Sequence, residues 1–138
     1  MWNVFDERFE PKRATIFSAG YDLFVDEEVT LYPGVFKTLD THVMFEYKDA
    51  KFLDGLWVAL VFPRSSYGFK YGLRFANTIG VIDSDYNDTI KMSVTVDKEV
   101  TLKVGDRYAQ MIIVPIIYLP TEKVPTEVRN GGVGSTGN

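Results

Sequence analysis

Short runs of alternating apolar and polar residues, broken by frequent turn residues, constrain the fold of this chain most strongly. Residues 43–47 and 90–96 follow the period-two pattern of half-buried strands. Trp57 to Phe62 and Met111 to Tyr118 are nearly continuous apolar runs, which predicts strands covered on both faces. Pro115 inside the second run indicates a bulge or an edge. With no apolar face of helical length, the pattern predicts an all-β sandwich or barrel.

Composition narrows the chemistry. The 138 residues are 46% hydrophobic and 25% charged, which fits one globular domain with its own core. The absence of cysteine excludes disulfides, thiolate metal sites and cysteine nucleophiles. The single histidine, His42, excludes a mechanism that needs a histidine pair, and its place in an alternating run predicts a structural role.

Charge and hydropathy bear on partners and compartment. The net charge is −4 and no basic stripe is present, so we expect no general binding to nucleic acid. The longest apolar stretch, Met111 to Leu119, is too short to cross a bilayer, and the first residues do not read as a signal peptide. We therefore expect no membrane partner and a cytoplasmic location, or the host cytoplasm if the chain is viral.

The chain divides into two parts of different composition. Residues 1–118 carry the strand patterns and are predicted to form one β-barrel domain. Residues 119–138 read as an extended C-terminal arm that ends in RNGGVGSTGN, a glycine-rich segment with one apolar side chain. Such a segment buries little, so a frayed terminus is the simple alternative to a functional arm.

Five short segments combine small, polar and charged residues in patterns that suggest a site. They are residues 18–23 (SAGYDL), 63–68 (PRSSYG), 77–86 (NTIGVIDSDY), 105–110 (GDRYAQ) and 129–137 (RNGGVGSTG). The second segment offers a guanidinium, two hydroxyls and free amides at a tight turn, which suits a phosphate; a plain polar turn is the alternative. In the third, Asp83 and Asp85 lie on the same side of an extended strand, as acid/base groups or as turn formers.

The last two segments leave alternatives open. Arg107 and Gln110 are candidates for buried hydrogen-bonding groups that hold an interface. The glycine-rich tail faintly resembles a P-loop, but it lacks the lysine and no helix follows it, so we reject that interpretation.

In this order and spacing, the five segments resemble the five motifs of the trimeric dUTPase family across residues 18–137. The resemblance implies a distorted jelly-roll β-barrel and a homotrimer whose C-terminal arm reaches a neighbouring subunit. It also implies hydrolysis of dUTP to dUMP and pyrophosphate with Mg²⁺, which keeps uracil out of DNA and supplies dUMP for dTTP synthesis.

The resemblance also implies a role for each matching residue. Asp83 is the general base that activates the attacking water, and Asp22 reaches Mg²⁺ through a bound water. The substrate-binding residues fall into three groups. The residues that hold the phosphates are Arg64, Ser65, Ser66 and Gln110. The residues that hold the nucleoside are Asn77, Gly80, Ile82 and Tyr86, and Tyr86 excludes a 2′-hydroxyl. The residues that form the lid are Arg129, Val133, Gly134, Ser135 and Thr136.

Three features depart from the family pattern. Asp88 stands where a glycine usually follows the tyrosine of the third motif, although Asn87-Asp88 can still form a turn. Val133 replaces the aromatic residue that normally stacks over the uracil. The spacing from Arg129 to the glycines is one residue short. The two departures in the fifth motif bear on closure of the lid rather than on the basic chemistry.

Three other interpretations remain. A dCTP deaminase shares the fold but carries a glutamate in the strand after the third motif, where this chain reads IKMSVTV. A dUTPase-like regulatory binding protein is a second alternative, although Asp83, Tyr86 and Arg64 are retained. A purely structural jelly roll gives no reason for a polar glycine-rich tail.

Overall fold

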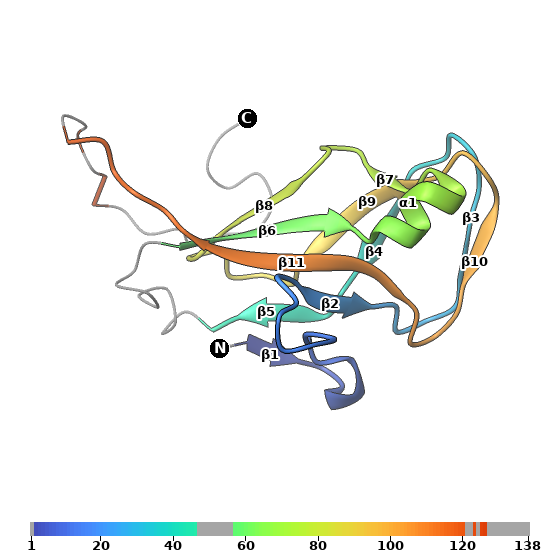
Figure 1. Ribbon diagram of the computed structural model, residues 1–138, viewed down its shortest axis with the longest axis horizontal. Helices are drawn as coiled ribbons and strands as arrows, with labels where there is room; N and C mark the ends of the chain where they lie inside the picture. Colours follow the sequence, from blue (N-terminus) through green and yellow to red (C-terminus); the bar gives the residue numbers. More distant parts are fainter. Residues whose placement is uncertain (1, 47–56, 121–122, 124, 127–138) are drawn as a thin grey trace.

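A long central strand organises the main sheet of the protein. The computed structural model describes residues 2–46, 57–120, 123 and 125–126. Within these residues the main sheet is four-stranded and antiparallel, in the order β2-β11-β6-β8, with β11 running through its middle (Figure 1). Its strands are β2 (Tyr21–Phe24), β11 (Arg107–Pro115), β6 (Trp57–Pro63) and β8 (Gly80–Asp83).

Shorter sheets complete the fold. In the described residues, β4 (Lys37–Asp40), β9 (Lys91–Thr95) and β7 (Arg74–Phe75) form a three-stranded sheet in the order β4-β9-β7. The two-stranded pairs are β1 (Trp2–Val4) with β5 (Val43–Phe45), and β3 (Val29–Leu31) with β10 (Val100–Leu102). The prediction of an all-β architecture is confirmed.

The two faces of the main sheet differ in burial. Along β6, Trp57, Ala59 and Val61 are at most 1% exposed and belong to the hydrophobic core, whereas Val58 and Leu60 are half-buried on the opposite face. In the single chain the prediction that both faces are covered is thus met on the core face, and the outer face is covered only in part. One face of this apolar run packs into the core. The other face is also apolar but is only half-buried in the single chain.

One helix interrupts the β pattern. The turn predicted at residues 63–68 is wrong, because Ser65–Tyr71 forms the short helix α1. The helix ends at Gly72, whose φ of 66° is left-handed and whose N–H donates to the Gly68 carbonyl. No residue of α1 is fully buried. Only Tyr67 and Tyr71, one turn apart, pack against the core, and such a pair is too short a pattern to predict a helix. No described helix is long and apolar enough to span a membrane.

His42 lies in the turn between β4 and β5 rather than inside a strand, with a φ of 54°. Its N–H donates to Asp40 Oδ1 at 2.8 Å, and its ring contacts Asp26 and stacks on Phe5 with centroids 5.3 Å apart. These contacts fit the predicted structural role, because they tie the turn to neighbouring segments.

Tyr108 provides a test of the packing. Tyr108 is 1% exposed, and its hydroxyl has no hydrogen-bond partner among the described residues. Burial raises the pKa of this hydroxyl well above the usual range. A buried hydroxyl without a partner costs about 1–3 kcal/mol. We therefore expect Tyr108→Phe to leave the free energy of unfolding unchanged or to raise it by about 1 kcal/mol, measured by urea unfolding at one protein concentration.

Tyr86→Phe is the matched control. Its hydroxyl donates to the Thr89 carbonyl at 3.2 Å, so its removal is expected to lower the free energy of unfolding by about 1 kcal/mol. Equal destabilisation by both substitutions would contradict the assignment of Tyr108.

Candidate active site

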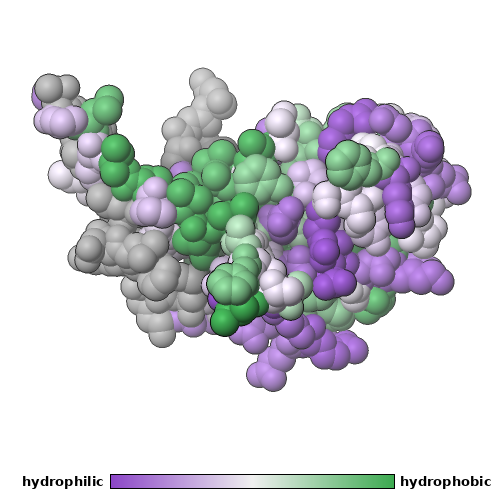
Figure 2. Space-filling view, in the orientation of Figure 1, coloured by the Kyte–Doolittle hydropathy of each residue, from purple (hydrophilic) through white to green (hydrophobic). Residues whose placement is uncertain are grey.

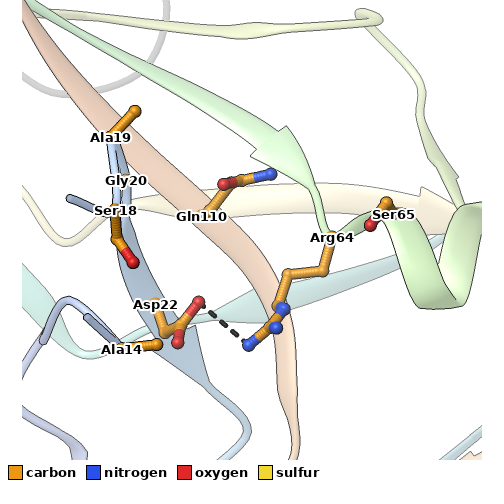
Figure 3. A pocket seen from close by; sticks show the side chains of 8 residues that line it. All are labelled: Ala14, Ser18, Ala19, Gly20, Asp22, Arg64, Ser65 and Gln110. Carbon is orange, nitrogen blue, oxygen red and sulfur yellow. Dashed lines mark ion pairs between the residues drawn. The ribbon is translucent and has the colours of Figure 1, made fainter.

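A polar pocket lies at the end of the main sheet where β6 ends, beside β2 and β11. Its volume is about 200 Å³. Figure 3 shows the side chains that line it, with Asp22 and Arg64 pointing toward each other. Seven of the eight lining residues come from three of the five segments identified in the sequence: Ser18, Ala19, Gly20, Asp22, Arg64, Ser65 and Gln110. The eighth, Ala14, lies outside these segments.

Strand pairing brings these segments together. Gln110 on β11 pairs with Asp22 on β2 and with Phe62 on β6, so the three side chains share one face of the sheet. Arg64 follows β6 directly, and its N–H donates to the Tyr108 carbonyl at 3.0 Å. The register of β11 therefore places the carboxylate, the amide and the guanidinium at one end of the sheet.

Gly20 allows the pocket wall to close. A Cβ on this residue would lie 2.9 Å from Gln110 Oε1, a separation that real Cβ atoms do not adopt. Gly20 thus lets the Gln110 side chain pack directly against the backbone, and a larger residue at position 20 would displace the tip of that side chain.

Asp22 carries the central ion pairs of the site. Its Oδ1 lies 3.0 Å from Arg64 Nη1, and its Oδ2 lies 3.4 Å from Arg107 Nη1. Arg64 Nη1 is buried and, despite this short distance, makes no hydrogen bond to any described group. Two guanidinium groups around one carboxylate leave a net positive charge, and a donor without a hydrogen bond is suited to a bound anion.

The predicted base, Asp83, and the four residues predicted to hold the nucleoside lie elsewhere in the chain. Gly80, Ile82 and Asp83 are on β8, with Asn77 exposed before the strand and Tyr86 buried after it. Gly80 has a packing reason to be glycine, because a Cβ there would meet Met92 Cε at 2.9 Å. None of these five residues lines the polar pocket.

The strand registers give the distance between Asp22 in the polar pocket and Asp83 on β8. Asp22 lies level with Phe62, and Asp83 lies level with Val58, four residues away along β6. Three strand spacings separate β2 from β8. At about 3.3 Å per residue and 4.8 Å per strand, the two aspartates are roughly 20 Å apart in one chain.

Other predicted residues fall outside the pocket. Ser66 is exposed on α1 and does not line it. The predicted lid residues Arg129, Val133, Gly134, Ser135 and Thr136 lie outside the described residues. Sequence reasoning missed Ala14 and the pairing of Arg107 with Asp22, since 85 residues separate that pair along the chain.

Comparison with known proteins identifies the family. The dUTPase family model matches residues 8–137. The chain belongs to the dUTPase family. The deoxyuridine 5'-triphosphate nucleotidohydrolase of Neisseria meningitidis serogroup A is 38% identical over 145 residues, covering 97% of this chain and 93% of the relative. The enzyme of that name from Wigglesworthia glossinidia brevipalpis is 39% identical over 117 residues, covering 82% of this chain and 73% of the relative.

Solved dUTPases share the fold. The crystal structure of the dUTPase from Streptococcus mutans matches with a TM-score of 0.71 and 30% identity, over 86% of this chain and 97% of that one. The dUTPase of Staphylococcus aureus phage phi11 matches with a TM-score of 0.67 at 23% identity, covering 92% of this chain and 96% of that one.

The ion pairs of Asp22 predict a measurable role in the stability of this dUTPase. Asp22→Asn removes the negative charge between Arg64 and Arg107, and the Asp22 side chain is only 11% exposed. We expect the free energy of unfolding to fall by about 1–3 kcal/mol, because a partly buried guanidinium loses its counter-charge.

Asp97→Asn is the control. Asp97 pairs with Arg74 at 2.7 Å, but its side chain is 67% exposed, so the expected loss is below about 0.5 kcal/mol. Thermal and urea unfolding of both variants would test this, and an equal loss in the two would refute the special role of Asp22.

Proposed function

We propose that the protein hydrolyses dUTP to dUMP and pyrophosphate. The polar pocket carries this proposal, because Asp22, Arg64, Ser65 and Gln110 converge there in a member of the dUTPase family. The guanidinium, hydroxyl and amide groups are suited to bind phosphate oxygens. Hydrolysis at the α-phosphorus needs a positioned base and groups that neutralise the charge of the triphosphate.

Asp83 is the proposed base. It lies exposed at the end of β8, where it can take a proton from a water that attacks the α-phosphorus. Asn77 and the backbone of Gly80 and Ile82 are proposed to bind the uracil edge, and Tyr86 to exclude a 2′-hydroxyl. The lid residues Arg129, Val133, Gly134, Ser135 and Thr136 are proposed to close over the triphosphate.

Asp22 is suited to hold Mg²⁺ through water. It is the only carboxylate that lines the described pocket, and no group of three or more metal-ligating side chains occurs in the described part of the chain. Mg²⁺ keeps several waters and commonly uses one or two carboxylates with substrate phosphates, so this donor set fits. Held there, Mg²⁺ would neutralise charge on the phosphates. Arg64 and Arg107 orient the Asp22 carboxylate.

The separation of Asp22 from Asp83 supports a site shared between copies of the chain. The outer face of the main sheet joins these two ends through an apolar surface, visible over β6 and β11 in Figure 2. Its residues are half-buried or exposed in one chain: Val58, Leu60, Phe62, Val81, Ile112 and Val114. We propose that the chain assembles as a homotrimer, which covers this face and brings Asp83 of one copy to the phosphate pocket of another.

The chain lacks the carboxylate that the dCTP deaminase alternative requires on the strand after the third motif. Strand β9 consists of Lys91–Thr95 and contains neither aspartate nor glutamate. The structure therefore offers no acidic side chain on this strand for a deamination.

A substrate screen with an active-site variant tests the proposed function. Incubation with each deoxynucleoside triphosphate, UTP and Mg²⁺ is expected to release pyrophosphate efficiently from dUTP alone. Asp83→Asn keeps the shape of the side chain but removes the base, so kcat should fall by about 10²–10⁴-fold while dUTP binding persists. Asp85→Asn, two residues away in the following turn, is the control and should keep most of its activity. If Asp83→Asn retained more than about a tenth of the wild-type kcat, the assignment of Asp83 as the general base would be refuted.

Complementation between two inactive variants tests the shared site. Asp83→Asn lacks the base and Arg64→Ala lacks a phosphate ligand, so each should be inactive alone. If every site takes its base and its phosphate pocket from different copies, random assembly of the two in equal amounts restores about a quarter of the sites.

The measurement is dUTP turnover of the coexpressed, differently tagged variants. Activity at the level of the separate variants would show that one chain supplies both groups. A mixture of wild type with Asp83→Asn calibrates the exchange of subunits.

A further inference from the structure

Two charged side chains, Asp88 and Lys91, fasten the turn between β8 and β9. Lys91 Nζ lies 3.2 Å from Asp88 Oδ2. The other oxygen of the same carboxylate accepts a hydrogen bond from the Thr89 N–H at 2.7 Å. We call Asp88 and Lys91, with the contacts that they make to Thr89, the Thr89 clamp. The proposed mechanism uses neither of these charged residues.

The clamp holds Thr89 by its side chain as well as by its backbone. Lys91 Nζ donates to Thr89 Oγ1 at 2.9 Å and to the Thr89 carbonyl at 3.3 Å. Thr89 Oγ1 donates in turn to Asp40 Oδ2 on β4, at 3.0 Å. The Thr89 N–H, and after it Lys91, hold the pKa of the Asp88 carboxyl below its usual value, so this group is a carboxylate at neutral pH.

The clamped residue is the anchor of Tyr86. The Tyr86 hydroxyl donates to the Thr89 carbonyl at 3.2 Å, and this is the carbonyl that Lys91 also contacts. The Tyr86 N–H donates to the Asp83 carbonyl at 3.0 Å, which ties the other end of the residue to β8. The position of the tip of the Tyr86 ring therefore depends on Thr89, and the position of Thr89 depends on the clamp.

We propose that Asp88 and Lys91 are positioning residues for the choice between deoxyribose and ribose, and that they act by holding Tyr86 through Thr89. This inference rests on the proposed function, in which Tyr86 excludes a 2′-hydroxyl. Exclusion by contact requires that the ring be held to within about 0.5 Å. A loosened Thr89 lets the ring retreat and admits the hydroxyl of UTP, while every group proposed to touch dUTP is still present.

Asp88 is one of the departures from the family pattern, which has a glycine at this position. A glycine has no carboxylate to accept from the Thr89 N–H or to pair with Lys91, so the family pattern itself provides no such clamp. The structure thus gives this departure a use in the proposed site.

The ratio of kcat/KM for dUTP to kcat/KM for UTP tests the clamp. Asp88→Ala and Lys91→Ala should each lower this ratio about three- to tenfold, the effect of losing one or two hydrogen bonds. The change should arise from a higher kcat/KM for UTP, with kcat for dUTP unchanged, whereas a general loss of structure would lower the activity on both substrates. Folding should persist, because the two side chains are 50% and 31% exposed.

Two further variants show whether the pair acts as one unit. Lys91→Arg keeps a cation opposite the carboxylate and should keep the ratio close to that of the wild type. The double variant Asp88→Ala/Lys91→Ala should lower the ratio no more than either single substitution does, because residues in one hydrogen-bonded network are not additive.

Arg74→Ala/Asp97→Ala is the matched control. It removes another ion pair, of 2.7 Å, at the opposite end of β9, where Arg74 pairs with Thr95, and the ratio should not change. An equal fall of the ratio in this control, additive falls in the two single variants, or an unchanged ratio in Lys91→Ala would overturn the clamp.

The clamp and the proposed function fail in different ways. If the wild type hydrolyses dUTP and both single variants keep its preference over UTP, the clamp is refuted and the proposed function stands. If the wild type does not hydrolyse dUTP, the proposed function is refuted, and calorimetric Kd values for dUMP and UMP decide on the clamp. A smaller difference between these two Kd values in both variants would support the clamp, and an unchanged difference would refute it.

Discussion

Strand β11 pairs with two neighbours at once, and its register decides which side chains share a face. Gln110 lies opposite Asp22 on one side and Phe62 on the other, while Met111 next to it is fully buried. Because side chains alternate along a strand, a slip of one residue would bury Gln110 and expose Met111. The cost of that slip to the hydrophobic core therefore also protects the polar pocket, so the geometry of the site is held by packing rather than by its own few polar contacts.

The same register places three kinds of surface on one face of the sheet. The end with the polar pocket carries Asp22 and Gln110, the opposite end carries Asp83, and apolar side chains such as Leu60 lie between them. A single chain cannot join ends that are roughly 20 Å apart. A copy placed across the apolar middle would cover it and supply the missing group, so assembly and catalysis would depend on the same face.

Local patterns in the sequence predicted the strands well but not the distances between them. The alternation at residues 90–96 locates β9 (Lys91–Thr95), and the run from Trp57 locates β6. Helix α1 was missed because it buries none of its residues completely. The pocket residues other than Ala14 were predicted, but the motifs gave no distance from them to Asp83, because strand order in the sheet differs from order along the chain. Only non-local pairing reveals that the motifs form two groups.

The surroundings of Asp22 are rich in positive charge, although the chain as a whole is acidic. The net charge is −4, yet Lys12, Arg13, Arg64 and Arg107 gather around Asp22. Repulsion from the remaining acidic surface is screened over about 8–10 Å at physiological ionic strength, whereas contacts inside a partly buried pocket are screened much less. A small cluster of cations can thus bind a triphosphate without making the whole protein a general binder of polyanions. Within the described residues these four cations are concentrated around Asp22, an arrangement that suits the short phosphate chain of the proposed substrate.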